Sequence, residues 1–305
     1  MGIKKGVETM TERLVMIGNG MAGVRTLEEL LKLAPEAYDI TVIGAEPFGN
    51  YNRILLSPVL SREKTLNDIM LNDLNWYSEN KIRLLAGRKI IGIDRSTRHV
   101  EVDDGSRIGY DRLIIATGSN PIVLPVPGAN LSGVITFRDI HDVNAMLAAA
   151  EQGRQAVVIG GGLLGLEAAY GLVTQGMSVT VIHLLDTLME RQLDKPAAAL
   201  LQRQLEGRGL RFCMQAQTEA ILGEQCVTGV RLKDGTVLQA DLVVMAVGIR
   251  PNFALAKSAG IHCDRGVVVN DTMQTYDPRV YAIGECVQHR NKTYGLVAPL
   301  FEMAK

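Results

Sequence analysis

The segment that most constrains the fold of this chain is residues 14–31, with the sequence LVMIGNGMAGVRTLEELL. Its first four apolar residues predict a buried parallel strand, and the spacing of the later apolar residues predicts an amphipathic helix. Three glycines lie between and just inside these elements. We expect Gly18 to allow a sharp turn, Gly20 to let the backbone approach a pyrophosphate, and Gly23 to let the helix pack on the strand. Free N–H groups and the positive dipole end of the helix favour phosphate at this point.

A second strand follows at residues 40–43, and Glu46 lies just beyond its end. An acid at this position accepts hydrogen bonds from a ribose 2′-OH. The alternative is a solvated loop carboxylate, and the position after the second strand favours the ribose role. The segment as a whole therefore predicts the front of a dinucleotide-binding unit.

The chain then continues with weaker signals. Trp76 and Tyr77 are expected to be packing anchors. The Asp104-Gly105 turn predicts a hairpin, and a strand ending in Ala116-Thr117-Gly118 precedes a proline-rich linker. The remaining predicted elements are a loosely patterned helix over 65–80 and strands at 83–85, 89–93 and 99–103.

The same pattern then occurs a second time, with a strand at 156–159, a helix at 163–175 and a strand at 179–182. Gly160, Gly162 and Gly165 repeat the glycine spacing of the first copy. Asp234-Gly235, Asp241 and Gly248 repeat Asp104-Gly105, Asp111 and Gly118 in the same register. Such a repeat decides the architecture. We predict an α/β chain with two Rossmann-like dinucleotide-binding domains, each of three layers with a parallel central sheet.

Two such units suggest two dinucleotides, and the economical pairing is a tightly held FAD with an exchangeable NAD(P)H. The alternative is that one copy has lost its ligand and serves as a scaffold. Arg53, in the loop after the second strand, either pairs with the flavin or its phosphates or is a surface cation. Both interpretations of Arg53 stay open.

The second unit differs from the first where coenzyme specificity is decided. His183 follows the strand at the position of an acid that would bind the NAD ribose. A neutral histidine neither requires a 2′-OH nor repels a 2′-phosphate, so the choice between NADH and NADPH stays open. Glu167 is either a normal helix-start carboxylate or a contact to the nicotinamide amide. Near the end of the chain, Gly284-Glu285 follows a short strand, where the carboxylate can accept a hydrogen bond from a sugar or ribitol hydroxyl.

Composition and charge exclude several classes of function. The chain has 305 residues, enough for two domains. Its net charge of −1, with mixed signs, excludes a basic surface for nucleic acid, and no apolar run approaches the roughly 20 residues of a membrane span. The first ten residues lack the apolar region of a signal peptide. Whether the natural start is Met1 or Met10 stays open.

The four cysteines, at positions 213, 226, 263 and 286, form no Cys-x-x-Cys pair. This argues against a redox-active vicinal disulfide and against iron–sulfur or zinc ligation in this segment, so we predict no metal site. Free cysteines favour a reducing, cytoplasmic compartment. Cys286 is expected to be a packed thiol, because no histidine or lysine flanks it.

Taken together, the chain resembles the two-dinucleotide flavoprotein reductases of the pyridine nucleotide–disulfide oxidoreductase class. The final acid of that class is usually Asp and contacts the flavin ribitol, so Glu285 departs from it by one methylene, which we expect to be tolerated. The missing Cys-x-x-Cys excludes the dithiol branch with glutathione and thioredoxin reductases. The motifs that carry the resemblance are Gly18-x-Gly20-x-x-Gly23 with Glu46, Ala116-Thr117-Gly118, Gly160-x-Gly162-x-x-Gly165 with Glu167, Gly248-Ile249-Arg250-Pro251-Asn252 and Tyr281-Ala282-Ile283-Gly284-Glu285.

A narrower resemblance is to the N-terminal flavin module of the assimilatory NAD(P)H nitrite reductase large subunit. It rests on NYNRILLS at 50–57, HLLDTLMERQLD at 183–194 and GLVAPL at 295–300. Related ferredoxin and rubredoxin reductases often carry Lys at the position of Pro58, so Pro58 favours the resemblance to the nitrite reductase group. Nitrite reductases continue into iron–sulfur and sirohaem domains, which we expect only if the full-length chain continues beyond residue 305. The C-terminal interface domain of the class is expected to be absent, which makes the chain a suspected fragment.

The resemblance implies a glutathione-reductase-like arrangement. The FAD-binding domain is expected at 10–122 and 252–305, with the NAD(P)-binding domain at 123–251 inserted between them. NAD(P)H is expected at the carboxyl ends of both sheets, in the crevice between the domains. The residues expected to bind FAD are Gly18, Gly20, Gly23, Glu46, Arg53, Thr117, Gly118, Gly284 and Glu285, and those expected to bind NAD(P) are Gly160, Gly162, Gly165, Glu167, His183 and Gly248.

Three functions follow as hypotheses. The first is hydride transfer from NAD(P)H to FAD in the electron-entry module of a nitrite reductase, in nitrate assimilation. The second is a stand-alone ferredoxin or rubredoxin reductase or an NAD(P)H oxidase, and the third is a non-catalytic redox sensor. The half-reaction requires no acid or base, and no convincing nucleophile is present. The expected partners are NAD(P)H, an electron-acceptor domain or protein and a second copy in a homodimer, with no nucleic acid and no membrane.

Overall fold

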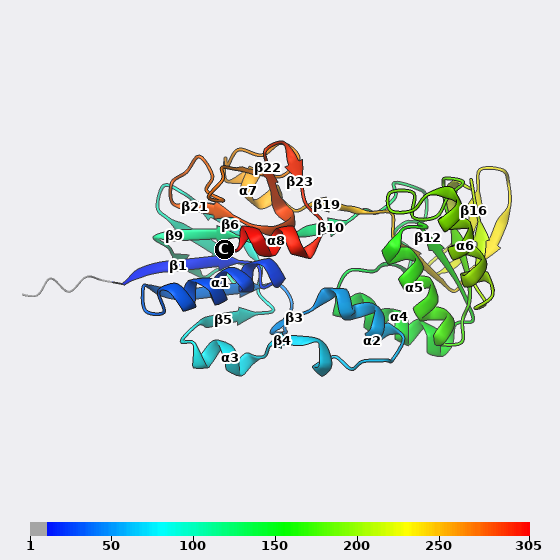
Figure 1. Cartoon of the computed structure of the whole chain (residues 1–305), viewed down its shortest axis with the longest axis horizontal. Coiled ribbons are helices and arrows are strands. Elements are labelled where there is room, and N and C mark those ends of the chain that lie inside the picture. Colours follow the sequence, from blue (N-terminus) through cyan, green and yellow to red (C-terminus); the bar gives the residue numbers. More distant parts are fainter. Residues whose placement is uncertain (1–10) are drawn as a thin grey trace, which may run out of the picture. The chain divides into compact units, whose positions relative to one another are not determined.

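The computed structural model describes residues 11–305, so the alternative start at Met10 lies outside the described residues (Figure 1). The described chain divides into two compact units. Unit 1 comprises residues 11–51, 70–120 and 251–305, and unit 2 comprises residues 52–69 and 121–250. The chain passes between them four times, after residues 51, 69, 120 and 250. The last two of these passages lie in two short strands that pair with each other, β10 (Ser119–Pro121) and β19 (Ile249–Pro251). Residues 52–69, which the sequence predicts in the FAD-binding domain, pack in unit 2.

Unit 1 is built on a five-stranded parallel sheet in the order β21-β9-β1-β2-β5. Side chains alternate between its two faces, as the strand period requires. Leu14 and Met16 face the cluster that contains α1 and α3, while Val15 and Ile17 face the opposite cluster. The strands are β1 (Glu12–Ile17), β2 (Tyr38–Gly44), β5 (Arg83–Ala86), β9 (Arg112–Ile115) and β21 (Val280–Ala282), and the two helices are α1 (Met21–Leu33) and α3 (Leu74–Glu79).

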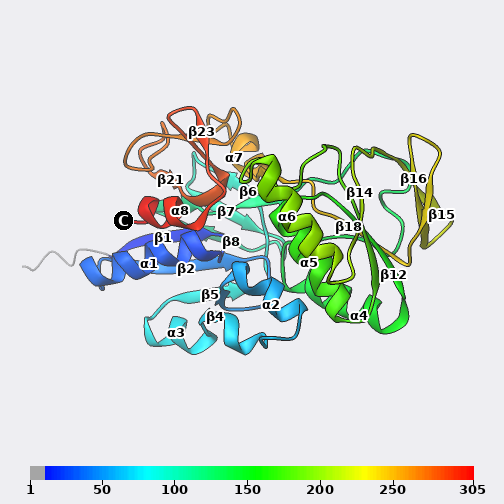
Figure 2. The same cartoon turned by 45° about the vertical axis from the view of Figure 1, so that its right-hand side comes forward.

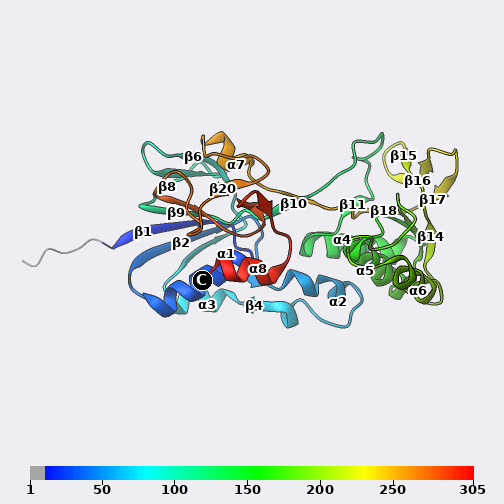
Figure 3. The same ribbon diagram turned by 45° about the horizontal axis from the view of Figure 1, so that its top comes forward.

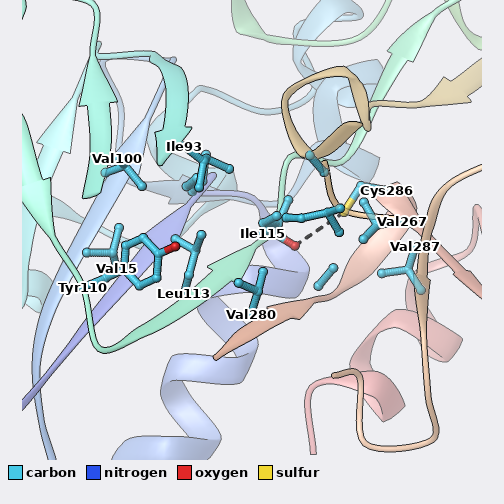
Figure 4. Packing of buried hydrophobic residues seen from close by; sticks show 14 of the residues in the cluster. Val15, Ile93, Val100, Tyr110, Leu113, Ile115, Val267, Val280, Cys286 and Val287 are labelled. Atoms are coloured by element: carbon cyan, nitrogen blue, oxygen red, sulfur yellow. Dashed lines mark hydrogen bonds between the residues drawn. The ribbon is translucent and has the colours of Figure 1, made fainter. Parts of the chain in front are cut away.

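The opposite face of this sheet carries an antiparallel three-stranded sheet and a short helix, which share one core with it. Cys286 lies in this core, fully buried, and its thiol donates to the carbonyl of Ile115 at 3.5 Å (Figure 4). Burial raises the pKa of the Cys286 thiol, so it is a packed thiol, as predicted. These elements are β6 (Ile90–Asp94), β7 (His99–Val102), β8 (Arg107–Gly109) and α7 (Ala254–Ser258).

Smaller elements complete unit 1. The C-terminal helix α8 lies beside α1 (Figure 1). The remaining elements are the pair β3 (Asn50–Tyr51) and β4 (Met70–Asn72), the sheet β20 (Val267–Val269), β22 (Val287–His289) and β23 (Lys292–Thr293), the 3₁₀ turn Gly284–Cys286, and α8 (Val297–Met303).

Unit 2 repeats this architecture with a parallel sheet in the order β11-β18-β12-β13-β14. Three helices lie on one side of the sheet and an antiparallel sheet of three strands on the other (Figure 3). The predicted α/β fold, with two three-layer Rossmann-like units, is therefore confirmed. The central strands are β11 (Val134–Thr136), β12 (Gln155–Ile159), β13 (Ser178–Ile182), β14 (Arg211–Cys213) and β18 (Leu242–Met245).

The helices of unit 2 include one from the segment 52–69. Helix α4 lies beside α5 (Figure 2), and the short helix α2 packs against both. The elements are α2 (Leu56–Leu60), α4 (Ile140–Gln152), α5 (Leu163–Thr174), α6 (Lys195–Glu206), β15 (Thr218–Gly223), β16 (Val227–Leu232), β17 (Val237–Gln239) and the 3₁₀ turns Arg53–Leu55 and Asn67–Ile69.

One secondary-structure prediction is largely wrong. Residues 65–80 do not form one helix but a 3₁₀ turn, the strand β4 and the short helix α3. The break has a local cause, because Asp73 caps α3 by accepting from the backbone N–H of Trp76 at 3.0 Å. The anchor role of Tyr77 is confirmed, since its side chain is 1% exposed.

Candidate dinucleotide sites

The glycine turn of unit 1 joins β1 to α1, and the surroundings of its three glycines differ. Gly18 has φ +109°, and a Cβ atom added there would lie 2.2 Å from the carbonyl oxygen of Ala116. A Cβ atom on Gly23 would contribute to crowding between helix and strands, 3.1 Å from the Cβ of Ala116. In contrast, a Cβ atom on Gly20 would meet no atom within 4 Å. The first and third glycines thus serve packing, and the second faces open space at the start of α1.

Asn19, in the middle of this turn, is held by hydrogen bonds to residues that are distant in the sequence. Asn19 accepts a hydrogen bond at its Oδ1 from the Tyr77 hydroxyl at 2.6 Å, and its Nδ2 donates to the carbonyl of Phe48 at 3.2 Å. Burial raises the pKa of Tyr77 to about 12, so the phenol stays protonated and remains a donor. Sequence reasoning missed this role, because nothing in the local pattern links Tyr77 to a residue 58 positions away.

Glu46 lies beyond β2, at the carboxyl edge where the ribose of a dinucleotide is expected. It is half-buried, and the hydroxyl of Tyr51 donates to its Oε2 at 2.6 Å. This bond fixes the direction of the carboxylate. The ribose role of Glu46 stays a prediction.

The carboxyl ends of β9 and β21 meet the same glycine turn. The hydroxyl of Thr117 donates to the carbonyl of Asn252 at 2.6 Å, and the N–H of Asn252 donates to the carbonyl of Gly118 at 2.8 Å. A Cβ atom on Gly284, which has φ +83°, would lie 3.0 Å from the Cβ of Ala22 in α1. The structure thus gathers Gly18, Gly20, Gly23, Thr117, Gly118 and Gly284 at one edge of the unit 1 sheet.

Glu285 joins this group through a partner that the sequence did not reveal. The hydroxyl of Ser119 donates to Glu285 Oε2 at 2.7 Å, and Ser119 is 8% exposed. Because the two residues are 166 positions apart, only the fold brings them together.

The glycine turn of unit 2 repeats the geometry of the first. Gly160 has φ +125°, and an added Cβ atom would lie 2.3 Å from the carbonyl oxygen of Ala246. A Cβ atom on Gly165 would lie 2.0 Å from the carbonyl oxygen of Gly160, whereas one on Gly162 would meet nothing within 4 Å. Gly248, at φ +113°, accepts from the N–H of Ile122 at 2.9 Å.

Two further candidates lie on or beside α5. Ser57, from α2, donates to Glu167 Oε2 at 2.5 Å, which places the segment 52–69 against the carboxylate. Arg53 lies in unit 2, and its guanidinium donates to the carbonyl of Arg138 at 3.0 Å. Arg53 and Glu167 thus both belong to unit 2. A flavin contact by Arg53 stays a prediction.

His183 follows β13 and is only 8% exposed. Its Nδ1 accepts from the N–H of Gly161 at 3.1 Å, and its Nε2 lies 3.0 Å from the carbonyl of Thr187. The imidazole is thus turned inward, toward the glycine turn and its own loop.

The residues present fit a dinucleotide at each glycine turn. Helices α3, α4 and α6 begin with aspartates whose side chains accept from the helix N–H groups. Helices α1 and α5 begin at Gly20 and Gly162 with no side-chain cap, and their first turns hold no acid. The first N–H groups of these two helices thus have no side-chain cap, and the space beside Gly20 and Gly162 is open, which suits a pyrophosphate.

Two further kinds of feature are absent from the part of the chain that the structure describes. Among residues 11–305, no group of three or more His, Cys, Asp or Glu side chains is arranged to hold a metal ion. Within the same range, no helix has the length and apolar character needed to cross a bilayer.

Comparison with known proteins identifies the family. Residues 12–298 match the pyridine nucleotide-disulphide oxidoreductase family. The chain belongs to this family, which makes it an oxidoreductase and confirms the resemblance drawn from the two glycine motifs.

The curated relatives narrow the comparison. The chain is 56% identical, over 96% of its length, to a nitrite reductase [NAD(P)H] of Bacillus subtilis, of which it covers 36%. It is 50% identical over 96% of its length to the assimilatory nitrate reductase electron transfer subunit of the same organism, of which it covers 38%. The predicted similarity to the nitrite reductase flavin module is therefore confirmed. The chain spans less than two fifths of the length of these two relatives.

Solved structures agree with the fold. A ferredoxin reductase from Rhodopseudomonas palustris matches 96% of this chain at a TM-score of 0.89 and 28% identity, and 74% of its own chain is covered. A putidaredoxin reductase in complex with putidaredoxin matches the same share at a TM-score of 0.88 and 30% identity, with 73% of that chain covered.

Proposed function

We propose that this chain accepts a hydride from NAD(P)H on FAD and passes the electrons onward, as the electron-entry module of a nitrite reductase in nitrate assimilation. The observation that carries the proposal is the presence of two glycine turns in one chain, each with an uncapped helix start and open space beside its second glycine. The nitrite reductase relative, 56% identical to this chain, supports the assignment of the pathway.

Unit 1 is proposed to hold FAD. The N–H groups at the start of α1 would bind the pyrophosphate beside Gly20, and Glu46 would bind the ribose of the adenosine half. Thr117, Gly118, Gly284 and Glu285 line the same edge and would hold the ribitol end. FAD, when bound, accepts a hydride and can release its electrons singly.

Unit 2 is proposed to hold NAD(P)H. The start of α5 beside Gly162 would bind the coenzyme pyrophosphate, with Gly160, Gly165 and Gly248 shaping the turn. Glu167, held by Ser57, would accept a hydrogen bond from the nicotinamide amide. The chain's own contribution is to bind and orient the coenzyme and to exclude water, since the first half-reaction needs no protein acid or base.

The electron acceptor is proposed to be an iron–sulfur or sirohaem centre carried by another domain or protein. A ferredoxin or rubredoxin reductase is the second candidate, because a probable ferredoxin reductase of Castellaniella defragrans is 34% identical over 90% of this chain. A cytoplasmic location and a homodimer stay predictions. Reduction of an added iron–sulfur carrier by the complete natural protein would favour the second candidate over the first.

The assignment of the two sites is tested by a matched pair of variants, Gly20→Val and Gly162→Val. A Cβ atom at either position would meet no atom within 4 Å outside the adjoining residues, so we expect both variants to fold. We expect G20V to be purified without FAD and G162V to keep FAD while its KM for NAD(P)H rises about tenfold or more. Absorbance spectra and steady-state kinetics with an artificial acceptor measure both effects.

The opposite pattern would show that the two sites are reversed. A G20V protein with a full complement of FAD would contradict the pyrophosphate role of this turn. FAD loss from both variants would contradict independent sites in the two units.

A further inference from the structure

We infer that His183 is a positioning residue that holds the glycine turn of unit 2 in its coenzyme-binding shape and does not itself contact the coenzyme. The inference rests on the proposed NAD(P) site of that unit. It changes the expected role of His183, which the sequence analysis listed among the residues that contact the nucleotide.

The first observation is that the loop after β13 holds Gly161 on both sides. The N–H of Gly161 donates to His183 Nδ1 at 3.1 Å, and its carbonyl accepts from the N–H of Met189 at 3.0 Å. A Cβ atom on Gly161 would lie 2.7 Å from both the Cγ of His183 and a methyl group of Leu188. Gly161 stands directly before Gly162, the residue beside the proposed pyrophosphate site, so the loop sets the path of the turn.

The second observation is the tautomer that these contacts require. A backbone N–H can only donate, so Nδ1 of His183 must present its lone pair to Gly161. The ring proton therefore sits on Nε2, where it is donated to the carbonyl of Thr187 at 3.0 Å. Glu190 faces the same nitrogen at 3.5 Å. Both nitrogens of the buried ring are used by the protein, so neither is available to a ribose.

The third observation is that backbone hydrogen bonds hold His183, where the loop begins, against residues 213–216. The N–H of His183 donates to the carbonyl of Cys213 at 2.9 Å, and its carbonyl accepts from the N–H of Ala216 at 3.0 Å. Met189 has φ +50°, an unusual backbone conformation for a residue other than glycine, and it aims its N–H at Gly161. The side chains next to His183 that do reach solvent are Leu184 and Leu185, which are 61% and 44% exposed.

A positioning role predicts equal effects on both coenzymes. NADH and NADPH share the pyrophosphate and differ only at the 2′ position of the adenosine ribose. Loss of the Gly161 contact should therefore weaken both to the same extent, whereas loss of a direct ribose contact should weaken one more than the other.

The test compares His183→Leu with His183→Asn in the FAD-loaded chain. Leu removes the acceptor and leaves the Gly161 N–H unpaired, whereas the Oδ1 of Asn can take the place of Nδ1. We expect H183L to raise the Kd of NAD⁺ and of NADP⁺ about tenfold, and H183N to stay within about threefold of the wild type. The readouts are isothermal titration calorimetry and the KM for NADH and NADPH, with kcat retained. His141→Leu, at an exposed position in α4, is the matched control.

A second measurement does not depend on any variant. NMR spectra of the nitrogen-labelled histidines report which ring nitrogen carries the proton. We expect His183 to be neutral with its proton on Nε2. A proton on Nδ1 would overturn the inference. If H183L is insoluble, H183N and His183→Gln decide the matter, because Gln places no acceptor at the Nδ1 position and should bind the coenzymes as weakly as expected for Leu.

Besides a proton on Nδ1, three binding results would overturn the inference while leaving the proposed function intact. They are wild-type affinity in H183L, weakening of NADP⁺ binding alone, and equal weakening in H183N and H183L. A wild-type chain that binds neither coenzyme would overturn the proposed function itself, and the inference with it.

Discussion

Ser119 and Glu285 form a hydrogen-bonded pair in unit 1. The class that this chain resembles usually carries Asp at the position of Glu285, which is one methylene shorter. In this chain the Ser119 hydroxyl binds the carboxylate at 2.7 Å and limits the directions that the longer side chain can take. We expect this bond to set the carboxylate for the ribitol hydroxyl of FAD.

Replacement of Ser119 by Ala should therefore weaken FAD binding about tenfold, because a hydrogen bond to a charged group is lost. Titration of the apoprotein with FAD, followed by quenching of flavin fluorescence, measures the effect. Ser119→Thr keeps the hydroxyl and serves as the control. An S119A protein that binds FAD as tightly as the wild type would show that Glu285 needs no such partner.

At the residue scale, the glycines could be predicted from sequence because their spacing follows from local geometry. A turn between a strand and a helix needs a positive φ at Gly18 and open space at Gly20, whatever the rest of the chain does. The partners could not be predicted. Ser57 and Glu167 are 110 positions apart, and only the packing of α2 on α5 brings their side chains together.

At the element scale, each unit has an aspartate that binds the backbone near the start of the strand before the glycine turn. Asp111 accepts from the N–H of Arg13 at 2.9 Å and from its guanidinium at 3.0 Å. Asp241 accepts from the N–H groups of Arg154 and Gln155 at 2.8 and 2.9 Å. These bonds explain why the aspartate occurs in both copies of the repeat, since Asp111 binds the start of β1 and Asp241 binds the start of β12.

Asp111→Asn should lower the free energy of unfolding by about 1 kcal/mol at neutral pH, a modest loss because the carboxylate is partly exposed. The bonds to Arg13 lower the pKa of Asp111 to about 2 in the folded chain, below its ordinary value of 3.8. The stabilisation is therefore complete above about pH 5 and is lost as the pH falls toward 2.

Urea unfolding at several pH values measures this difference. The gap between the wild type and D111N should close on acidification. Glu36→Gln, which removes half of an exposed pair with Lys81, is the control and should show little effect at any pH. A gap that stays constant down to acidic pH would contradict an ionised Asp111 as its source.

Residues 52–69 form the second feature at the element scale. Leu60 of α2 is fully buried, and its side chain fills the place that a Cβ atom on Gly171 of α5 would need, at 2.6 Å. The side-chain amide of Gln175 also donates to the carbonyl of Leu60 at 2.9 Å. These contacts explain why this segment packs in unit 2.

Leu60→Ala should destabilise unit 2 by about 2–5 kcal/mol, because it leaves a cavity in a packed contact. It should also expose residues 52–69 to proteolysis. Guanidinium unfolding and limited proteolysis with mass spectrometry measure both effects. Leu200→Ala, at a 58% exposed position of α6, is the matched control. An L60A protein as resistant as L200A would contradict the packing of this segment on α5.

Elements with a strong period could be predicted from sequence, as α1, α5 and the strands β1, β2, β12 and β13 show, whereas the short central strands β11 and β14 were not predicted. The helix predicted over 65–80 lacked such a period and was wrong. Helices α4 and α6 were not among the predicted elements, although Asp139 and Asp194 cap them and a proline stands in the first turn of α6. These residues are helix-start signals, and they predict both α4 and α6.

At the scale of the whole molecule, two units share one topology, and we propose that they hold two different ligands. Each unit presents a glycine turn at the carboxyl edge of its parallel sheet. The chain covers 36% of its nitrite reductase relative, and the final electron acceptor stays a proposal. In the proposed function, the task of this chain is to bring a hydride from the nicotinamide coenzyme onto the flavin.

The most direct test of this claim is the visible spectrum of the FAD-loaded chain under anaerobic conditions, before and after addition of NADH or NADPH. We expect the flavin absorbance to bleach with at least one of the two coenzymes, and the one that acts at lower concentration is the preferred donor. A flavin that stays oxidised while the coenzyme binds would contradict hydride transfer and favour a sensor.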